Sequence, residues 1–180
     1  MKNKLILSFL FLFPLFVNSS FSADEKYDKY IGECTDETFK NNLIRLYEND
    51  PALTTLCMGI SSLHGEAIQN IEAISWATTN NTHLTELNNT GSNIRDEGAQ
   101  ILANMLKKNK GILRLNLTNN HIGEDGATAL AEAIQLNQNL LDINLDLNGK
   151  IHGKNGSIDS IIDSISRNRK RQGLFPLTKE

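Results

Sequence analysis

The stretch ILRLNLTNNHIGEDGATALAEAI, residues 112–134, changes its hydrophobic period halfway along. At its start Leu115 and Leu117 alternate with polar residues, which is typical of a strand with one buried face. From Ala127 onward apolar residues recur at helical spacing and form a single stripe. The stretch therefore predicts a strand followed by a helix.

This strand–helix pattern occurs four times in the chain. At an offset of 28 residues, two copies align without a gap, so that Leu87 falls on Leu115 and Gly98 on Gly126. The copy that begins at Leu140 has about three extra residues, and the copy that begins at Leu53 matches the pattern less closely. The copies span residues 53–83, 84–111, 112–139 and 140–169. A repeat of 28–31 residues predicts a solenoid, in which each unit buries its apolar face against its neighbours.

The motif L-x-x-L-x-L-x-x-N-x-I, read from Ile112 to Ile122, resembles the leucine-rich repeat. The period resembles the ribonuclease-inhibitor-like subtype, and the pairing of GAQILANMLKKNKGILRLNL with GATALAEAIQLNQNLLDINL is similar to repeats of tropomodulins and leiomodins. The resemblance covers about residues 53–169. It implies a curved α/β solenoid with parallel strands on the concave side and helices on the convex side. It also implies actin as one candidate partner, although an export signal departs from those cytosolic proteins.

The N-terminus predicts a signal peptide at residues 1–23. MKNK is positively charged, LILSFLFLFPLFV is apolar, and NSSFSA supplies small residues for cleavage after Ser22 or Ala23. The apolar run is shorter than the roughly 20 residues needed to span a bilayer. We expect a secreted or periplasmic protein without an integral membrane segment after cleavage.

Both ends of the solenoid need cover. Residues 24–52 predict a helical N-terminal cap, because TDETFKNNLIRLYEND has Phe39, Leu43 and Leu46 at helical spacing. Residues 170–180 form a C-terminal tail, whose GLFPL segment we expect to fold over the far end.

The two cysteines allow two interpretations. Export permits a disulfide between Cys34, before the cap helix, and Cys57, on the first predicted strand. The alternative is two free thiols, with Cys57 exposed on the concave face.

Residues between the strand leucines are the predicted partner-binding candidates, because they point out of the concave face. One column alternates in charge, and another contains three asparagines. Mutual neutralisation and a hydrogen-bonded amide ladder would explain these columns without a ligand, whereas the functional interpretation is a polar protein-binding surface. The candidates are Thr55, Glu86, Asn88, Thr90, Arg114, Asn116, Thr118, Asp142, Asn144 and Asp146.

Two departures from a regular repeat are notable. Asn89 occupies a position that leucine fills in the next two copies, which predicts a buried amide satisfied by hydrogen bonds or water. The basic run Arg167–Arg171 complements the dipole of the last predicted helix. A net charge of −3 gives no reason to expect a nucleic-acid partner.

No catalytic constellation is evident in the sequence. The four histidines are scattered, and neither a nucleophile-elbow serine nor a glycine-rich phosphate loop is present. We therefore expect a monomeric, non-catalytic module that binds a protein without cofactor or metal, one form of which is a bacterial protein acting on a host. The alternative is a structural envelope protein that associates with itself end to end.

Overall fold

The structure is a computed structural model that describes residues 23–32, 34–58, 67–149, 151 and 156–177. It divides into two compact units, Met1–Glu33 and Cys34–Glu180, each considered by itself. In the first unit, α1 (Ala23–Tyr27) continues into a π-helical turn, η1 (Asp28–Gly32). The predicted signal peptide lies, apart from Ala23, outside the described residues. Among the residues that are described, no helix has the length and apolar character needed to cross a membrane.

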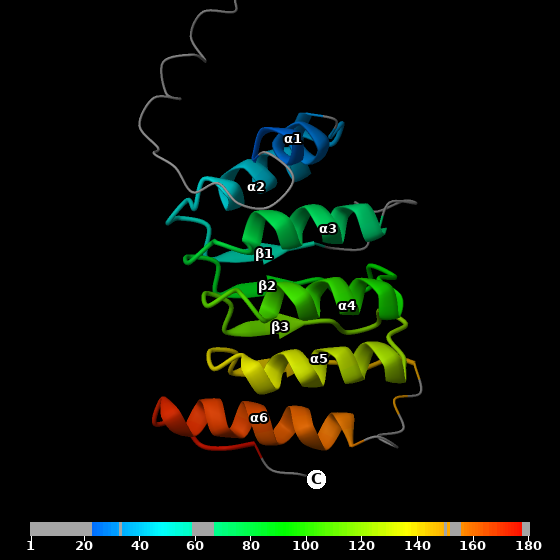
Figure 1. The fold of residues 1–180 in the computed structure, drawn as a ribbon, viewed down its shortest axis with the longest axis vertical. Helices are drawn as coiled ribbons and strands as arrows, with labels where there is room; N and C mark the ends of the chain where they lie inside the picture. Colours follow the sequence, from blue (N-terminus) through cyan, green and yellow to red (C-terminus); the bar gives the residue numbers. More distant parts are fainter. Residues whose placement is uncertain (1–22, 33, 59–66, 150, 152–155, 178–180) are drawn as a thin grey trace, which may run out of the picture. The chain divides into compact units, whose positions relative to one another are not determined.

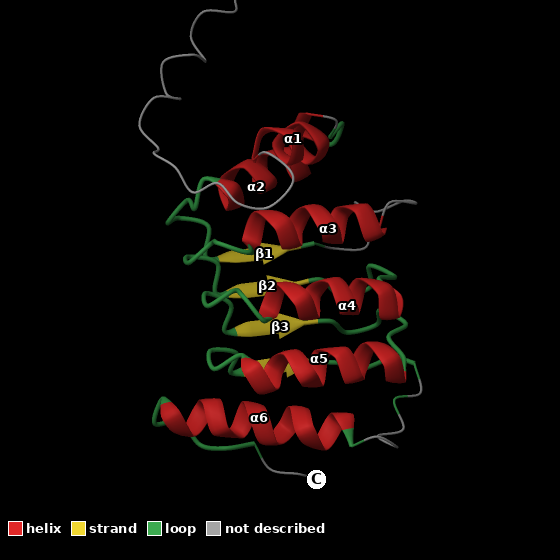
Figure 2. Cartoon of the chain, in the orientation of Figure 1, coloured by secondary structure: helices red, strands yellow, loops and turns green. Residues whose placement is uncertain are grey.

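The second unit repeats a strand and a helix after one leading helix (Figures 1 and 2). The strands are followed by successive helices that pack side by side, α3 against α4, α4 against α5 and α5 against α6. The elements are α2 (Glu37–Tyr47), β1 (Thr55–Cys57), α3 (Ala67–Thr78), β2 (Glu86–Asn88), α4 (Arg95–Leu106), β3 (Arg114–Asn116), α5 (Glu124–Leu136), β4 (Asp142–Asn144) and α6 (Ser157–Arg171).

The four strands form one parallel sheet in sequence order, β1-β2-β3-β4. Its register places Leu56, Leu87, Leu115 and Ile143 in one row, as the repeat alignment predicts. The three leucines are at most 3% exposed, whereas Ile143 on the edge strand is half-buried. The leucines therefore anchor the sheet to the helices, and the residues between them face away from this core.

A buried asparagine joins each repeat to the one before it. Asn109 donates from Nδ2 to the carbonyls of Thr78 (2.7 Å) and Asn81 (2.9 Å), while its Oδ1 accepts from the amides of Gly111 and Ile112. The equivalent residues also donate to carbonyls of the preceding unit, and Asn81 and Asn137 accept two amides each in the same way. We call these four residues the buried asparagine series: Asn81, Asn109, Asn137 and Asn168. All four are at most 3% exposed, so each bond replaces water that burial has removed.

The recurring glycines near the helix starts, Gly98 and Gly126, lie so close to neighbouring side-chain atoms that a Cβ would clash with them. A Cβ on Gly126 would lie 2.6 Å from Asp96 Oδ1 and 2.8 Å from a methyl carbon of Ile122. The same Asp96 oxygen accepts from the amides of Gly123 (2.6 Å) and Gly126 (3.0 Å). The carboxylate of one helix start therefore satisfies amides at the start of the next helix, and only glycine leaves room for it.

The predicted cap helix is α2, which packs against α3. Asp36 caps its N-terminus by accepting from two backbone amides at 2.9 Å, and Phe39, Leu43 and Leu46 are buried. The exposed ring of Tyr47 stacks on half-buried Trp76 of α3 at a centroid distance of 4.9 Å. Aromatic stacking and the buried stripe together attach the cap to the first repeat.

Candidate functional site

The exposed face of the parallel sheet is the candidate site. Parallel sheets are normally covered on both faces, but here the outward residues of every strand remain exposed or half-buried. Strand register brings the sequence candidates into two columns about 4.8 Å apart from strand to strand. The first column is Thr55, Glu86, Arg114 and Asp142, and the second is Cys57, Asn88, Asn116 and Asn144.

The charge column is only partly neutralised. Arg114 donates to Glu86 Oε2 from Nε (3.1 Å) and Nη2 (3.0 Å), and the two side chains are 53% and 35% exposed. Such an exposed pair contributes at most about 1 kcal/mol to stability. Asp142 is exposed and has no ion-pair partner within the described residues. The column therefore consists of a neutral pair followed by an uncompensated carboxylate.

The strand asparagines do not form a ladder across the sheet. Each uses its Oδ1 within its own turn: Asn116 Oδ1 accepts from the backbone amide (3.0 Å) and the hydroxyl (2.7 Å) of Thr118. Asn88 holds Thr90 in the same way, and Asn144 accepts from the amide of Asp146. Within the described part of the chain, no hydrogen bond engages the three side-chain NH2 groups, so they remain available as donors to a partner.

The predicted partner-binding residues that follow the strands differ in how exposed their side chains are. Thr90 and Thr118 are half-buried and their hydroxyls donate to the preceding asparagine, whereas Asp146 is exposed. Asp146 therefore adds a second carboxylate, in the turn two residues after the end of β4, to that end of the face. The first strand has a different character, because Thr55 and Cys57 are both exposed and uncharged. The negative charge of the face is thus concentrated at β4.

The predicted disulfide is wrong, because both cysteines are free. Cys57 is exposed on the sheet face, whereas Cys34 lies before α2 and donates from Sγ to the carbonyl of Asp36 (3.4 Å). The cap helix packs against α3 rather than over the outward face of β1, so it does not bring Cys34 to Cys57. Partial burial raises the pKa of the Cys34 thiol above its ordinary value.

Asn89 is fully buried, as the sequence predicted, but its amide is only half satisfied. Its side-chain Oδ1 accepts from Ser92 Oγ (3.2 Å), and its backbone carbonyl accepts from Asn120 Nδ2 (2.6 Å). Its own Nδ2 has no hydrogen-bond partner among the described residues. The side chain serves the turn after β2, away from the exposed sheet face.

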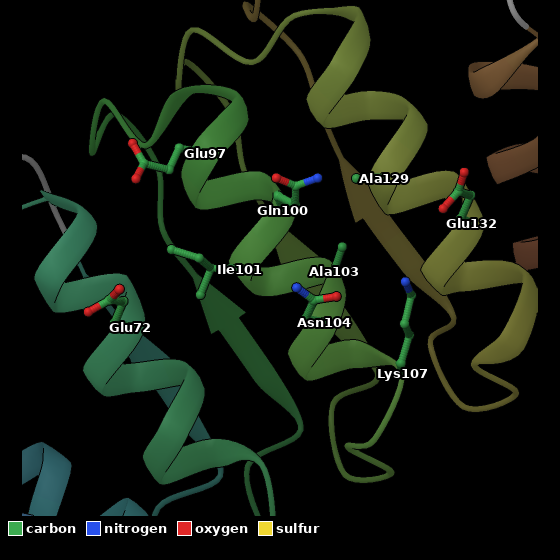
Figure 3. A pocket seen from close by; sticks show the side chains of 9 residues that line it. All are labelled: Glu72, Glu97, Gln100, Ile101, Ala103, Asn104, Lys107, Ala129 and Glu132. Atoms are coloured by element: carbon green, nitrogen blue, oxygen red, sulfur yellow. The ribbon is translucent and has the colours of Figure 1, made fainter. Parts of the chain in front are cut away.

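Sequence reasoning missed a shallow groove on the helical side (Figure 3). It has a volume of about 300 Å³ and continues into a second depression of about 570 Å³ that shares Glu97, Gln100 and Glu132. Lys107, which follows α4, and Glu72 of α3 also line the groove, and Figure 3 shows Lys107 at the end away from Glu97. The only sequence signal would have been the recurrence of acids on exposed helix faces. Among the described residues, no group of three potential metal ligands converges.

The comparisons with known proteins agree with this geometry. Residues 80–103 and 108–131 match the model of the leucine-rich repeat. The fold is a leucine-rich-repeat solenoid. A search of curated protein sequences gave no match.

The solved structures that resemble this solenoid include the following two. The chain aligns with leiomodin-1 Actin-Binding Site 2 at 24% identity and a TM-score of 0.63, covering 77% of this chain and 94% of that one. It aligns with the tropomodulin C-terminal domain from Caenorhabditis elegans at 15% identity and a TM-score of 0.52, covering 77% and 96%. The predicted similarity to leiomodin and tropomodulin repeats is confirmed at the level of the fold.

Proposed function

We propose that the chain is a non-catalytic module that binds a protein partner through the outward face of β1–β4. The observation that carries the proposal is this uncovered face of a parallel sheet, which presents three amide donors and the carboxylates of Asp142 and Asp146. Solenoids of this type use such extended surfaces for binding. The rigid hydrogen-bonded repeats below the face hold these groups at fixed spacings, which favours a folded protein as partner.

Affinity capture tests this proposal. The wild-type protein is immobilised beside the variant Asp142→Lys/Asp146→Lys. This variant reverses the charge at two exposed positions whose side chains hold no turn together by hydrogen bonds. The matched control is Glu48→Lys/Glu132→Lys, with the same change in net charge at two exposed positions away from the sheet, the C-cap of α2 and the surface of α5. We expect a protein retained by the wild type and the control to be lost by the sheet-face variant. Equal retention by all three would place binding elsewhere and refute the proposal.

Actin is the first named partner to test, because the leiomodin-1 domain with a similar fold is an actin-binding site. Co-sedimentation with filamentous actin and gel filtration with monomeric actin would detect binding to either form. Binding that Asp142→Lys/Asp146→Lys abolishes would name the partner. Absence of binding removes actin but leaves the sheet face to be tested with other proteins.

We further propose that the protein is exported, from the charge and apolar pattern of its first 23 residues. One form of this proposal is delivery by a bacterium toward a host protein. N-terminal sequencing of protein recovered from the periplasm and the medium tests export. We expect a new terminus near Ala23, whereas retention of Met1 in the cytoplasmic fraction would contradict it.

A further inference from the structure

The last repeat presents apolar side chains at positions that neighbouring helices cover in the interior. In α4 and α5 these positions are alanines at most 4% exposed, whereas α6 has half-buried Ile158 and Ile162 there. No described helix follows α6, so this side of it, the end face, lacks the cover that α5 gives α4. The aligned alanine pairs are Ala99 with Ala103 and Ala127 with Ala131.

The C-terminal tail adds to this end face instead of closing it. It lies along α6 (Figure 1), held by bonds from Arg169 Nε to the carbonyl of Phe175 (2.7 Å) and from the Leu177 amide to Ser166 Oγ (3.1 Å). These bonds fix the tail backbone, but Phe175 is 88% exposed. Six large apolar side chains are exposed among the described residues, and three of them, Leu174, Phe175 and Leu177, are in this short tail.

The last described repeat has two half-buried isoleucines beside an apolar tail, and clustered exposed apolar side chains mark interaction surfaces. The end face therefore has the character of an interface. Its apolar residues form two groups. Ile158 and Ile162 are half-buried at the start of α6, and the tail, with the exposed side chain of Phe175, lies near the end of α6.

The charges of α6 indicate which partner fits. Asp159 and Asp163 are exposed in its first half, and Arg167, Lys170 and Arg171 in its second half. Asp159, Asp163 and Lys170 are four and seven residues apart, so they form one row along the helix, about 100° around it from Ile158 and Ile162 and hence along the border of the end face. When a second α6 runs antiparallel, each acidic half meets the other basic half. A surface that complements itself in this way under a two-fold rotation is the requirement for an isologous dimer.

We propose that the end face binds a second copy of this chain, with the two α6 helices antiparallel about a two-fold axis. The tail of each copy, with Phe175 projecting, covers Ile158 and Ile162 of the other. Asp159 of each copy lies near the partner's Lys170. This dimer is closed, so it differs from the monomer expected from the sequence and from end-to-end stacking into filaments. It leaves the outward face of the sheet free and does not depend on the proposed function.

Sedimentation velocity over a range of concentrations tests the dimer on protein purified from cells expressing the whole chain. Phe175→Asp is the informative variant because the side chain is almost wholly exposed, so folding should be unaffected. Leu136→Asp, at a 64% exposed position of α5, is the matched control. We expect wild type and control to dimerise and Phe175→Asp to raise the dimer dissociation constant at least about tenfold. A wild type that stays monomeric at all concentrations, or a Phe175→Asp that dimerises like wild type, overturns the proposal.

Charge exchange tests the two-fold arrangement itself. Asp159→Lys/Asp163→Lys and Lys170→Glu/Arg171→Glu should each weaken self-association, because like charges then meet twice across the axis. Mixing the two variants should restore a dimer, since one contact is reversed and the other is native. Circular dichroism checks that each variant keeps its helices, because the reversed charges also oppose the helix dipole. Failure of the mixture to associate more tightly than either variant alone would refute the antiparallel pairing.

Discussion

Replacing Asn109 with alanine is the sharpest test of what holds the repeats together. Its side chain is 1% exposed and makes four hydrogen bonds of 2.7–2.9 Å. Two are donated to carbonyls of the preceding repeat, at Thr78 and Asn81, and two are accepted from the amides of Gly111 and Ile112. Alanine removes all four and leaves backbone groups on both sides of the repeat junction without this partner.

The expected cost follows from these bonds. Each buried hydrogen bond contributes about 1 kcal/mol net, and stranded buried groups cost somewhat more. We therefore expect Asn109→Ala to lower the free energy of unfolding by about 4 kcal/mol. Small domains are stable by only about 5–15 kcal/mol. The variant should remain folded in buffer but unfold at a much lower urea concentration.

Urea unfolding followed by circular dichroism measures this loss. Asn104→Ala is the control, because Asn104 is an exposed asparagine on α4, and its loss should change stability by at most about 0.5 kcal/mol. A loss below about 1 kcal/mol for Asn109→Ala would show that water or neighbouring groups replace the amide. The buried asparagine series would then not be what couples the repeats.

Three further predictions follow from the structure. Gly126→Ala should destabilise the protein by roughly 1–3 kcal/mol in urea unfolding, because the added Cβ would lie 2.6 Å from a carboxylate oxygen; an unchanged midpoint would contradict this. The hydrogen bond from Arg45 lowers the pKa of Asp50, so carbon-detected NMR titration of Arg45→Gln should show a higher Asp50 pKa. Since the folded pKa lies below the unfolded one, the stabilisation is present above the unfolded pKa and is lost as pH falls through the folded pKa, below about pH 4. An Asp50 pKa that does not move would show that Arg45 is not its cause. Mass spectrometry under non-reducing alkylation should find two free thiols, with exposed Cys57 reacting before Cys34, whose pKa is raised by partial burial; a mass two hydrogens lower would reveal a bridge.

The sequence predicted the strands, helices and register because each follows from the spacing of apolar residues. Leu87 and Leu115 lie in one row of the sheet, as their equivalence at an offset of 28 required. The cap helix was equally visible, since Phe39 and Leu43 mark its buried side. These features depend on local periodicity, which a single sequence records directly.

The site was less accessible from sequence because it depends on packing between elements. The disulfide prediction needed to know which surface α2 covers, and it packs on α3 rather than over Cys57. The groove that Lys107 lines is formed by side chains of three neighbouring helices, α3, α4 and α5. The spacing of residues along the sequence does not predict such a groove. The sequence placed the strand asparagines correctly but could not show that each Oδ1 is occupied by its own turn.

Recurrence alone therefore does not separate structure from function in this chain. Asparagines recur every 28 residues on the sheet face and every 28–31 residues in the buried series, and the turn after each strand explains part of the recurrence on the sheet face. The more informative residues on the face are those that differ between repeats. Asp142 takes the repeat position of Arg114, and Asp146 takes that of Thr118, so each carboxylate replaces a side chain of different chemistry. No turn or core contact requires either aspartate side chain. Where the repeat does not require a particular residue, selection for a particular partner can determine which residue is present. Substitutions at these two aspartates therefore test binding with the least risk to the fold.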